Sequence, residues 1–184
     1  MTSQDQTTPQ KVIAFWRAAG PDKWFTKDES FDAECRRLFL PSHRAAAAGE
    51  LAHWEDSPEG ALALLILLDQ MPRNMFRPSP QTYATDAQAL ALAERAISRA
   101  YDQQFDPPER GFFYLPLMHS EHLPDQERCV ALYRAAGDDY GLKYAEDHAD
   151  IIRRFGRFPH RNVILGRSTT AEEQAFLDAG GFAG

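Results

Sequence analysis

The stretch EGALALLILLDQ, residues 59–70, decides the fold of this chain, because the helix that it predicts is apolar on almost every side. Ser57 followed by Pro58 marks its start, with an N-cap residue and then proline at the first helical position. A helix without a polar face is normally buried, so we expect this one to be the central helix of the fold. Its apolar run, residues 61–68, is too short to cross a bilayer.

Helical periodicity extends from this segment in both directions. Apolar spacing predicts two earlier helices, around residues 12–16 and 31–39, and Pro41 is expected to kink or end the second one. Thr85 with Gln88, and Thr169 with Glu172, form capping-box patterns that start later helices. Three further helices are predicted. The first begins at residue 124, the second covers residues 142–155, and the last covers residues 168–177.

No segment alternates between polar and apolar residues as a strand would, so the predicted fold class is all-α. The 184 residues suit one domain with one sizeable core. We expect residues 9–184 to form a single domain of roughly eight helices with short connections. The polar residues 1–8, MTSQDQTT, are expected to be a disordered tail.

Composition excludes several classes of function. The formal net charge of −7 argues against general nucleic-acid binding, which usually needs a basic face. The sequence shows neither a secretory signal nor a membrane span, which predicts a cytoplasmic protein. Cys35 and Cys129 have no metal-ligand spacing and form no disulfide framework, so we expect no metal and no cofactor.

Asp69 ends the most apolar helix, where a carboxylate needs a partner and the helix dipole is already negative. Arg73 is the nearest candidate partner along the chain. One alternative is a structural clasp between these two side chains that fixes the turn. The other alternative is a ligand-facing role, and the sequence leaves both open.

A second polar segment, HSEHLPDQ, covers residues 119–126. His119, Glu121 and His122 lack the spacing of the zincin helix motif, and the cysteine pair of zinc deaminases is absent. No metal site is therefore predicted here, and the segment is either a site or a solvated loop. His148 lies on an apolar helix face, where it is either a core residue or the border of a pocket.

The third polar segment, RRFGRFPHRNVILGRST, covers residues 153–169 and holds five arginines, one histidine and no acid. Arg153 and Arg154 complement a helix C-terminus, and Gly156 can supply its left-handed cap. The remaining cations lie beyond that helix. They form either a phosphate or carboxylate site or a salt-bridge network with Asp69, Glu121 and Asp125.

Three long segments resemble the bacterial family known as domain of unknown function 924. They are LALLILLDQMPRN (62–74), FFYLPLMHSEHLPDQ (112–126) and HADIIRRFGRFPHRNVILGRST (148–169). The likeness covers nearly the whole chain, although this sequence has Met71 where the family usually has phenylalanine and His122 where an acid is common. The resemblance implies a tetratricopeptide-repeat-like fold of antiparallel helix pairs, and it implies no established activity.

A pocket formed by the three segments could have one of three functions. The first is binding, with or without hydrolysis, of a small anionic ligand held by arginines, with a histidine as acid or base. The second is a non-enzymatic, tetratricopeptide-like interaction module that binds a partner peptide, in which the polar residues are a structural network. The third is a metal-independent ribonuclease that uses Arg154 and His160, although Gly156 and Pro159 interrupt the helix that such a motif needs.

The candidate residues follow from the three segments. The catalytic candidates are His119, Glu121, His148 and His160. The ligand-binding candidates are Asp69, Arg73, Asn74, Gln126, Arg157, Arg161, Asn162 and Arg167. The predicted partner is a small anionic molecule or a peptide, with no nucleic acid and no membrane, and the oligomeric state is left open.

Overall fold

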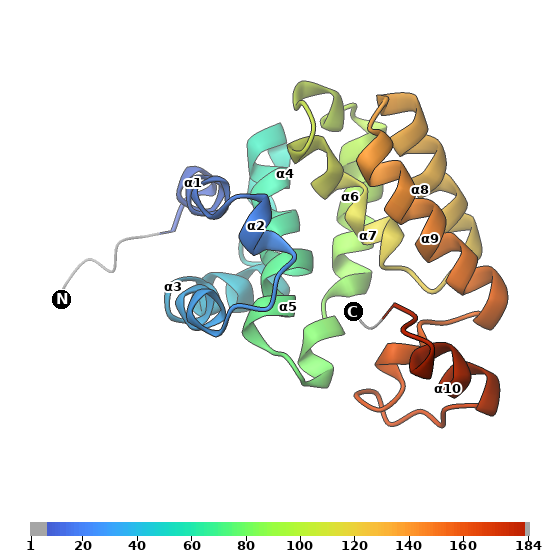
Figure 1. Ribbon diagram of the computed structural model, residues 1–184. Coiled ribbons are helices and arrows are strands. Elements are labelled where there is room, and N and C mark those ends of the chain that lie inside the picture. Colours follow the sequence, from blue (N-terminus) through green and yellow to red (C-terminus); the bar gives the residue numbers. More distant parts are fainter. Residues whose placement is uncertain (1–6, 183–184) are drawn as a thin grey trace. The chain divides into compact units, whose positions relative to one another are not determined.

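The structure is a computed structural model that describes residues 7–182, and these residues form helices and no strand (Figure 1). The prediction of an all-α fold is therefore confirmed for this part of the chain. Two compact units are present, one of residues up to 77 together with 81–116, and one of residues 78–80 together with the chain from 117 onward. The prediction of one domain over residues 9–184 stays a prediction.

The first unit is built around a continuous helical segment. It consists of α4 (Pro58–Leu65), a π-helical turn (Ile66–Gln70) and α5 (Met71–Met75). The Ser57 hydroxyl accepts a hydrogen bond from the Gly60 N–H at 3.1 Å, which confirms the predicted N-cap. Residues 60–72 are all buried, so the prediction of a buried central helix is also confirmed.

Three longer helices surround this segment (Figure 1): α1 (Pro9–Ala19), α3 (Glu29–Ala47) and α6 (Asp86–Ser98). Residues 1–6 of the predicted tail lie outside the described residues, whereas Thr8 is the N-cap of α1. The shorter elements are α2 (Pro21–Trp24), α7 (Leu115–Met118) and 3-10 turns at Ala52–Asp56, Pro80–Tyr83, Asp102–Gln104 and Glu109–Phe113.

Pro41, which was expected to kink or end its helix, does not end it. Helix α3 continues past Pro41 to Ala47, because its buried face, which includes Phe39 and His43, holds the helix by packing. Pro72 follows the π-helical turn, in which the Met71 N–H donates to the Ile66 carbonyl. The missing N–H of Pro72 then falls at the start of α5, where no helical partner is required.

Both capping-box predictions need correction. Thr85 is the N-cap of α6, but its hydroxyl donates to the Leu68 carbonyl of the π-helical turn rather than capping the helix. The second box is present one residue later than predicted, formed by Thr170 and Glu173 at the start of α10 (Ala171–Asp178). The sequence TTAEE permits both registers, and the structure uses the later one.

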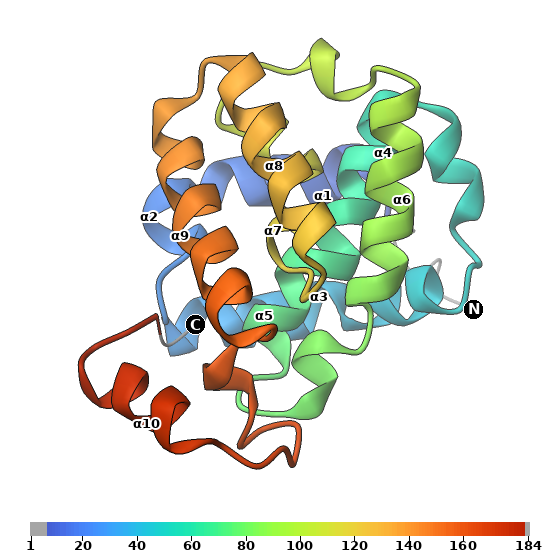
Figure 2. The same cartoon turned by 90° about the vertical axis from the view of Figure 1, so that its right-hand side faces the viewer.

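The second unit contains a helical hairpin. Helices α8 (Leu123–Ala136) and α9 (Asp139–Phe155) lie side by side (Figure 2). Gly137, with φ +67°, permits the tight reversal between them. Gly156, with φ +69°, ends α9 in the left-handed conformation that the sequence predicts. Phe158 then packs on Ile151 and Ile152, and Pro159–Arg161 form a 3-10 turn that leads toward α10.

None of the helices in the described part of the chain is long and apolar enough to span a membrane. Cys35 and Cys129 are buried and form no disulfide bond, and burial raises the pKa of each thiol to about 12. Neither cysteine supplies a thiolate at neutral pH.

Candidate functional site

In the first unit, Asp69 is buried and pairs with Arg73. This is the structural clasp, one of the two alternatives that the sequence left open. The Asp69 side chain is 1% exposed, and its Oδ1 lies 3.4 Å from Nη1 of Arg73. Gln70 donates a hydrogen bond to the other carboxylate oxygen. Arg73 also donates to both oxygens of Asp86 at 3.0 Å, so one guanidinium joins the end of the buried helical segment to the first turn of α6.

Asn74 also has a partner within this unit. Its Nδ2 donates to Oδ1 of Asp32 at 2.8 Å, and Arg77 Nη2 lies 3.3 Å from the same oxygen. Asp32 and Asp86 were not among the predicted residues, because nothing in their local sequence marks them as partners of a distant segment. The ligand-binding candidates of this unit therefore bond to one another and to acids of their own unit.

In the second unit, Glu121 and Arg167 form a two-point ion pair. Arg167 Nη1 and Nη2 donate to the two oxygens of Glu121 at 2.7 and 2.9 Å. The Phe158 N–H donates to Glu121 Oε1 at 2.8 Å, and Arg167 Nε donates to Asn162 Oδ1 at 3.0 Å. The second and third polar segments therefore meet directly, with acid against base.

A second two-point pair joins the same turn to α10. Arg157 Nε and Nη2 donate to the oxygens of Glu173 at 2.6 and 2.9 Å. Glu173 Oε2 also accepts from Asn162 Nδ2 at 3.2 Å and from the Thr170 N–H at 2.8 Å. Glu173 is 2% exposed, and sequence reasoning missed it. The Thr170–Glu173 capping-box register was the one signal that could have found it.

These pairs fix the charge states of the two acids. The side-chain hydrogen bonds from Arg157 lower the pKa of Glu173 to about 2, against the opposing effect of burial. Burial alone would raise the pKa of Glu121, but Arg167 and the Phe158 N–H outweigh it and lower that pKa. Both carboxylates are therefore ionised at neutral pH, and neither is poised to donate a proton.

The remaining candidates occupy separate positions in the second unit. His119 offers its backbone carbonyl to Arg161 Nη2 at 3.0 Å, and the Arg161 guanidinium lies 4.6 Å from the Phe158 ring centroid. Buried Gln126 donates to the carbonyls of Met118 and Ser120. The ring centroid of His160 lies 5.1 Å from that of Phe182. The prediction that residues 69–74 join this cluster stays a prediction, because they belong to the other unit.

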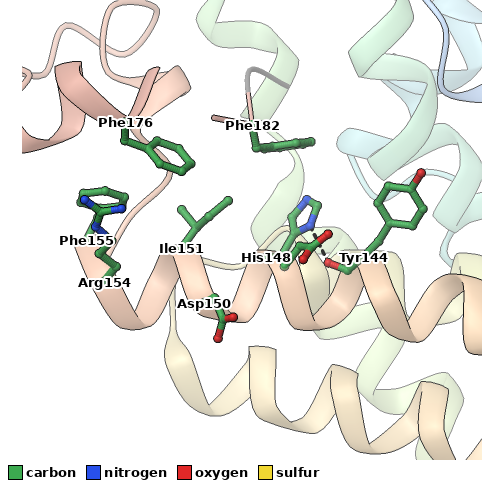
Figure 3. Close-up of a pocket in the computed structure, with 9 residues that line it drawn as sticks. Tyr144, His148, Asp150, Ile151, Arg154, Phe155, Phe176 and Phe182 are labelled. Atoms are coloured by element: carbon green, nitrogen blue, oxygen red, sulfur yellow. Dashed lines mark hydrogen bonds between the residues drawn. The ribbon is translucent and has the colours of Figure 1, made fainter. Parts of the chain in front are cut away.

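A groove of about 350 Å³ runs along α9 in this unit (Figure 3). Its lining residues are Tyr144, Asp147, His148, Asp150, Ile151, Arg154, Phe155, Phe176 and Phe182. Phe176 and Phe182 face the side of α9 that carries His148 and Ile151, whereas Asp150 points away from both phenylalanines. His148 Nδ1 lies 2.8 Å from the Tyr144 carbonyl oxygen, so this ring nitrogen bonds to the helix itself.

The cation at this groove is also paired. Arg154 Nε donates to Glu172 at 3.0 Å, and its guanidinium lies 4.6 Å from the Phe155 ring centroid. The lining is mainly aromatic and aliphatic, and most of the predicted site residues are not part of it. The described residues hold no group of three or more His, Cys, Asp or Glu side chains placed to bind a metal ion.

The Asp69 clasp predicts a loss of stability when the carboxylate is removed. Asp69→Ala should lower the free energy of unfolding by about 3 kcal/mol, because it leaves the partly buried Arg73 with one carboxylate fewer. Urea denaturation measures this change. Asp106→Ala, at an exposed position of the same unit, is the matched control and should stay within about 0.5 kcal/mol of the parent protein. Equal effects of the two substitutions would contradict the clasp.

The Arg157–Glu173 pair predicts a pH dependence of stability. Because the pKa of Glu173 is lowered from 4.5 to about 2, the stabilisation is complete above pH 4.5 and is lost as the pH falls toward 2. Glu173→Gln should therefore destabilise the protein by about 2 kcal/mol at pH 7, and the difference from the parent should shrink as the pH approaches 2. Urea denaturation at a series of pH values measures it, and a difference that does not change with pH would rule the pair out.

Comparisons with known proteins give the relationships of this chain. Residues 12–181 match the family described as "Bacterial protein of unknown function (DUF924)". A solved structure of a protein of unknown function from Agrobacterium tumefaciens is similar, with 46% sequence identity and a TM-score of 0.90. The match covers 94% of this chain and 97% of that one. A search of curated proteins gave no match. The chain belongs to the bacterial protein family DUF924.

Proposed function

We propose that this protein is a non-enzymatic binding module whose groove along α9 receives a peptide segment of a partner protein. In this proposal the arginines of the third polar segment are structural. They hold the turn after α9 and helix α10 in place, and α10 supplies one wall of the groove. The tetratricopeptide-like relationship is part of the proposal, since proteins of that type present binding surfaces on packed helix pairs such as α8 and α9.

The observation that carries the proposal is the two-point pairing of Arg157 and Arg167 with Glu173 and Glu121. An anionic ligand at these arginines would have to displace a carboxylate that already has two charge-assisted hydrogen bonds. A site prepared for an anion would instead present unpaired donors. A small anionic ligand, with or without hydrolysis, is therefore the less favoured proposal.

The groove has the size and chemistry for an apolar anchor. A volume of about 350 Å³ lies within the usual range of ligand sites and accommodates one or two large side chains. Phe155, Phe176 and Phe182 offer ring faces and edges to such a residue. The carboxylate of Asp147 at the same groove, on a chain of net charge −7, favours a peptide that also carries a basic residue.

We also propose a cytoplasmic location, on the basis of the two cysteines. Cys35 and Cys129 form no disulfide bond, whereas proteins of oxidising compartments more often pair their cysteines. Both thiols are reduced but buried, so neither is placed to act as a nucleophile.

The test is a selection from a random peptide display library, followed by fluorescence anisotropy with the selected peptides. We expect these peptides to share a large apolar residue next to a basic one. Phe182→Ser should weaken their binding at least tenfold, because burial of a phenylalanine ring contributes about 1.5–3 kcal/mol.

Val163→Ser is the matched control, since Val163 is 85% exposed in the same unit and does not line the groove. It should leave the peptide affinity unchanged. The proposal fails if no peptide is selected, or if the selected peptides bind the Phe182→Ser variant as tightly as the parent protein.

A further inference from the structure

The N-terminal half of α9 carries two tyrosines that the folded unit leaves exposed. Tyr140 is 71% exposed and Tyr144 is 42% exposed. Their ring centroids lie 5.1 Å apart with an interplanar angle of 62°, and their hydroxyl oxygens lie 3.4 Å apart. The two rings therefore form a paired aromatic surface next to the groove that Tyr144 lines. Exposed tyrosines of this kind are typical of binding surfaces.

Asp147 follows Tyr144 by three residues, so the two side chains share one face of α9. Asp147 is exposed, lines the groove, and forms no hydrogen bond or ion pair with any other residue in the described part of the chain. Lys143, one turn earlier, makes no ion pair with it in the described structure. Asp150, by contrast, is paired with Arg153.

We infer that Tyr140, Tyr144 and Asp147 form a subsite for an arginine side chain of the partner peptide. A guanidinium can lie on a tyrosine face and at the same time donate two N–H groups to a carboxylate. Lysine offers a smaller, more strongly hydrated charge and cannot make the planar contact. This inference rests on the proposed function, because it names the residue that accompanies the apolar anchor in the groove.

The electrostatics of α9 are compatible with a cation at this position. The positive end of the helix dipole lies near Tyr140, but Asp139 in the first turn opposes it. Asp138 caps the same end by accepting a hydrogen bond from the Gly141 N–H at 2.9 Å. The arginines paired with Glu172 and Glu173 do not compete for Asp147, since their charges are already matched.

The test uses single-residue probes, so that it does not depend on the apolar part of the groove. N-acetyl-arginine methylamide is titrated into the intact protein, and the ring resonances of Tyr140 and Tyr144 are followed by nuclear magnetic resonance. N-acetyl-citrulline methylamide has the same shape without the charge. We expect saturable shifts with the arginine probe and at least a tenfold lower affinity for the citrulline probe. The affinity of Nα-acetyl-lysine methylamide should lie between the two.

Asp147→Asn should remove the preference for arginine over citrulline. Glu146→Gln, at the neighbouring exposed acid that pairs with Arg134, should preserve it. Equal affinities of arginine and citrulline for the parent protein would overturn the subsite, as would an unchanged preference in Asp147→Asn. Unchanged circular dichroism spectra establish that both variants are folded.

The two proposals fail in different ways. Phe182→Ser should leave the arginine preference intact, because the probe does not reach an apolar anchor position. A protein that selects no peptide and still prefers arginine over citrulline retains the subsite and loses the proposed function. A protein that binds peptides through the groove without this preference retains the proposed function and loses the subsite.

Discussion

The buried carboxylate of Glu173 is the constraint on which the C-terminal part of the chain depends. Helix α10 has eight residues, which is too short to be stable by helix propensity alone. The Arg157 guanidinium stabilises it from the turn after α9, together with the packing of Phe176 on Phe155. Asn162 extends the contact toward Arg167 and Glu121. This chain of bonds holds α10 in place, so the Phe176 wall of the groove depends on it.

The same principle explains why an acidic protein gathers cations in one short segment. Each guanidinium of that segment that could have held an external anion has an internal acceptor, such as Glu121 for Arg167 and the His119 carbonyl for Arg161. In the other unit, Arg73 likewise forms ion pairs with Asp69 and Asp86. The arginines act as internal connectors, and in the proposed function the binding surface lies along α9 instead.

Sequence patterns predicted the features that depend on local periodicity and on single residues. The buried helix of residues 59–70, its Ser57 cap, the Gly156 cap and the need of Asp69 for a cation are all of this kind. Pro41 was expected to kink or end its helix, but α3 continues past it to Ala47, because packing of its buried face overrides the usual rule. Glu173 and the groove were missed, because a partner 16 residues away and an arrangement of three phenylalanines arise only from tertiary contacts.

A double-mutant cycle on Glu121 and Arg167 tests most directly whether the basic cluster is structural. The free energy of unfolding is measured for the parent protein, Glu121→Gln, Arg167→Met and the double variant. The account predicts a coupling energy of about 1–3 kcal/mol, because each single change leaves a partly buried group without its charged partner. Effects that add within about 0.5 kcal/mol would contradict it, since they would mean that Arg167 does not act through Glu121.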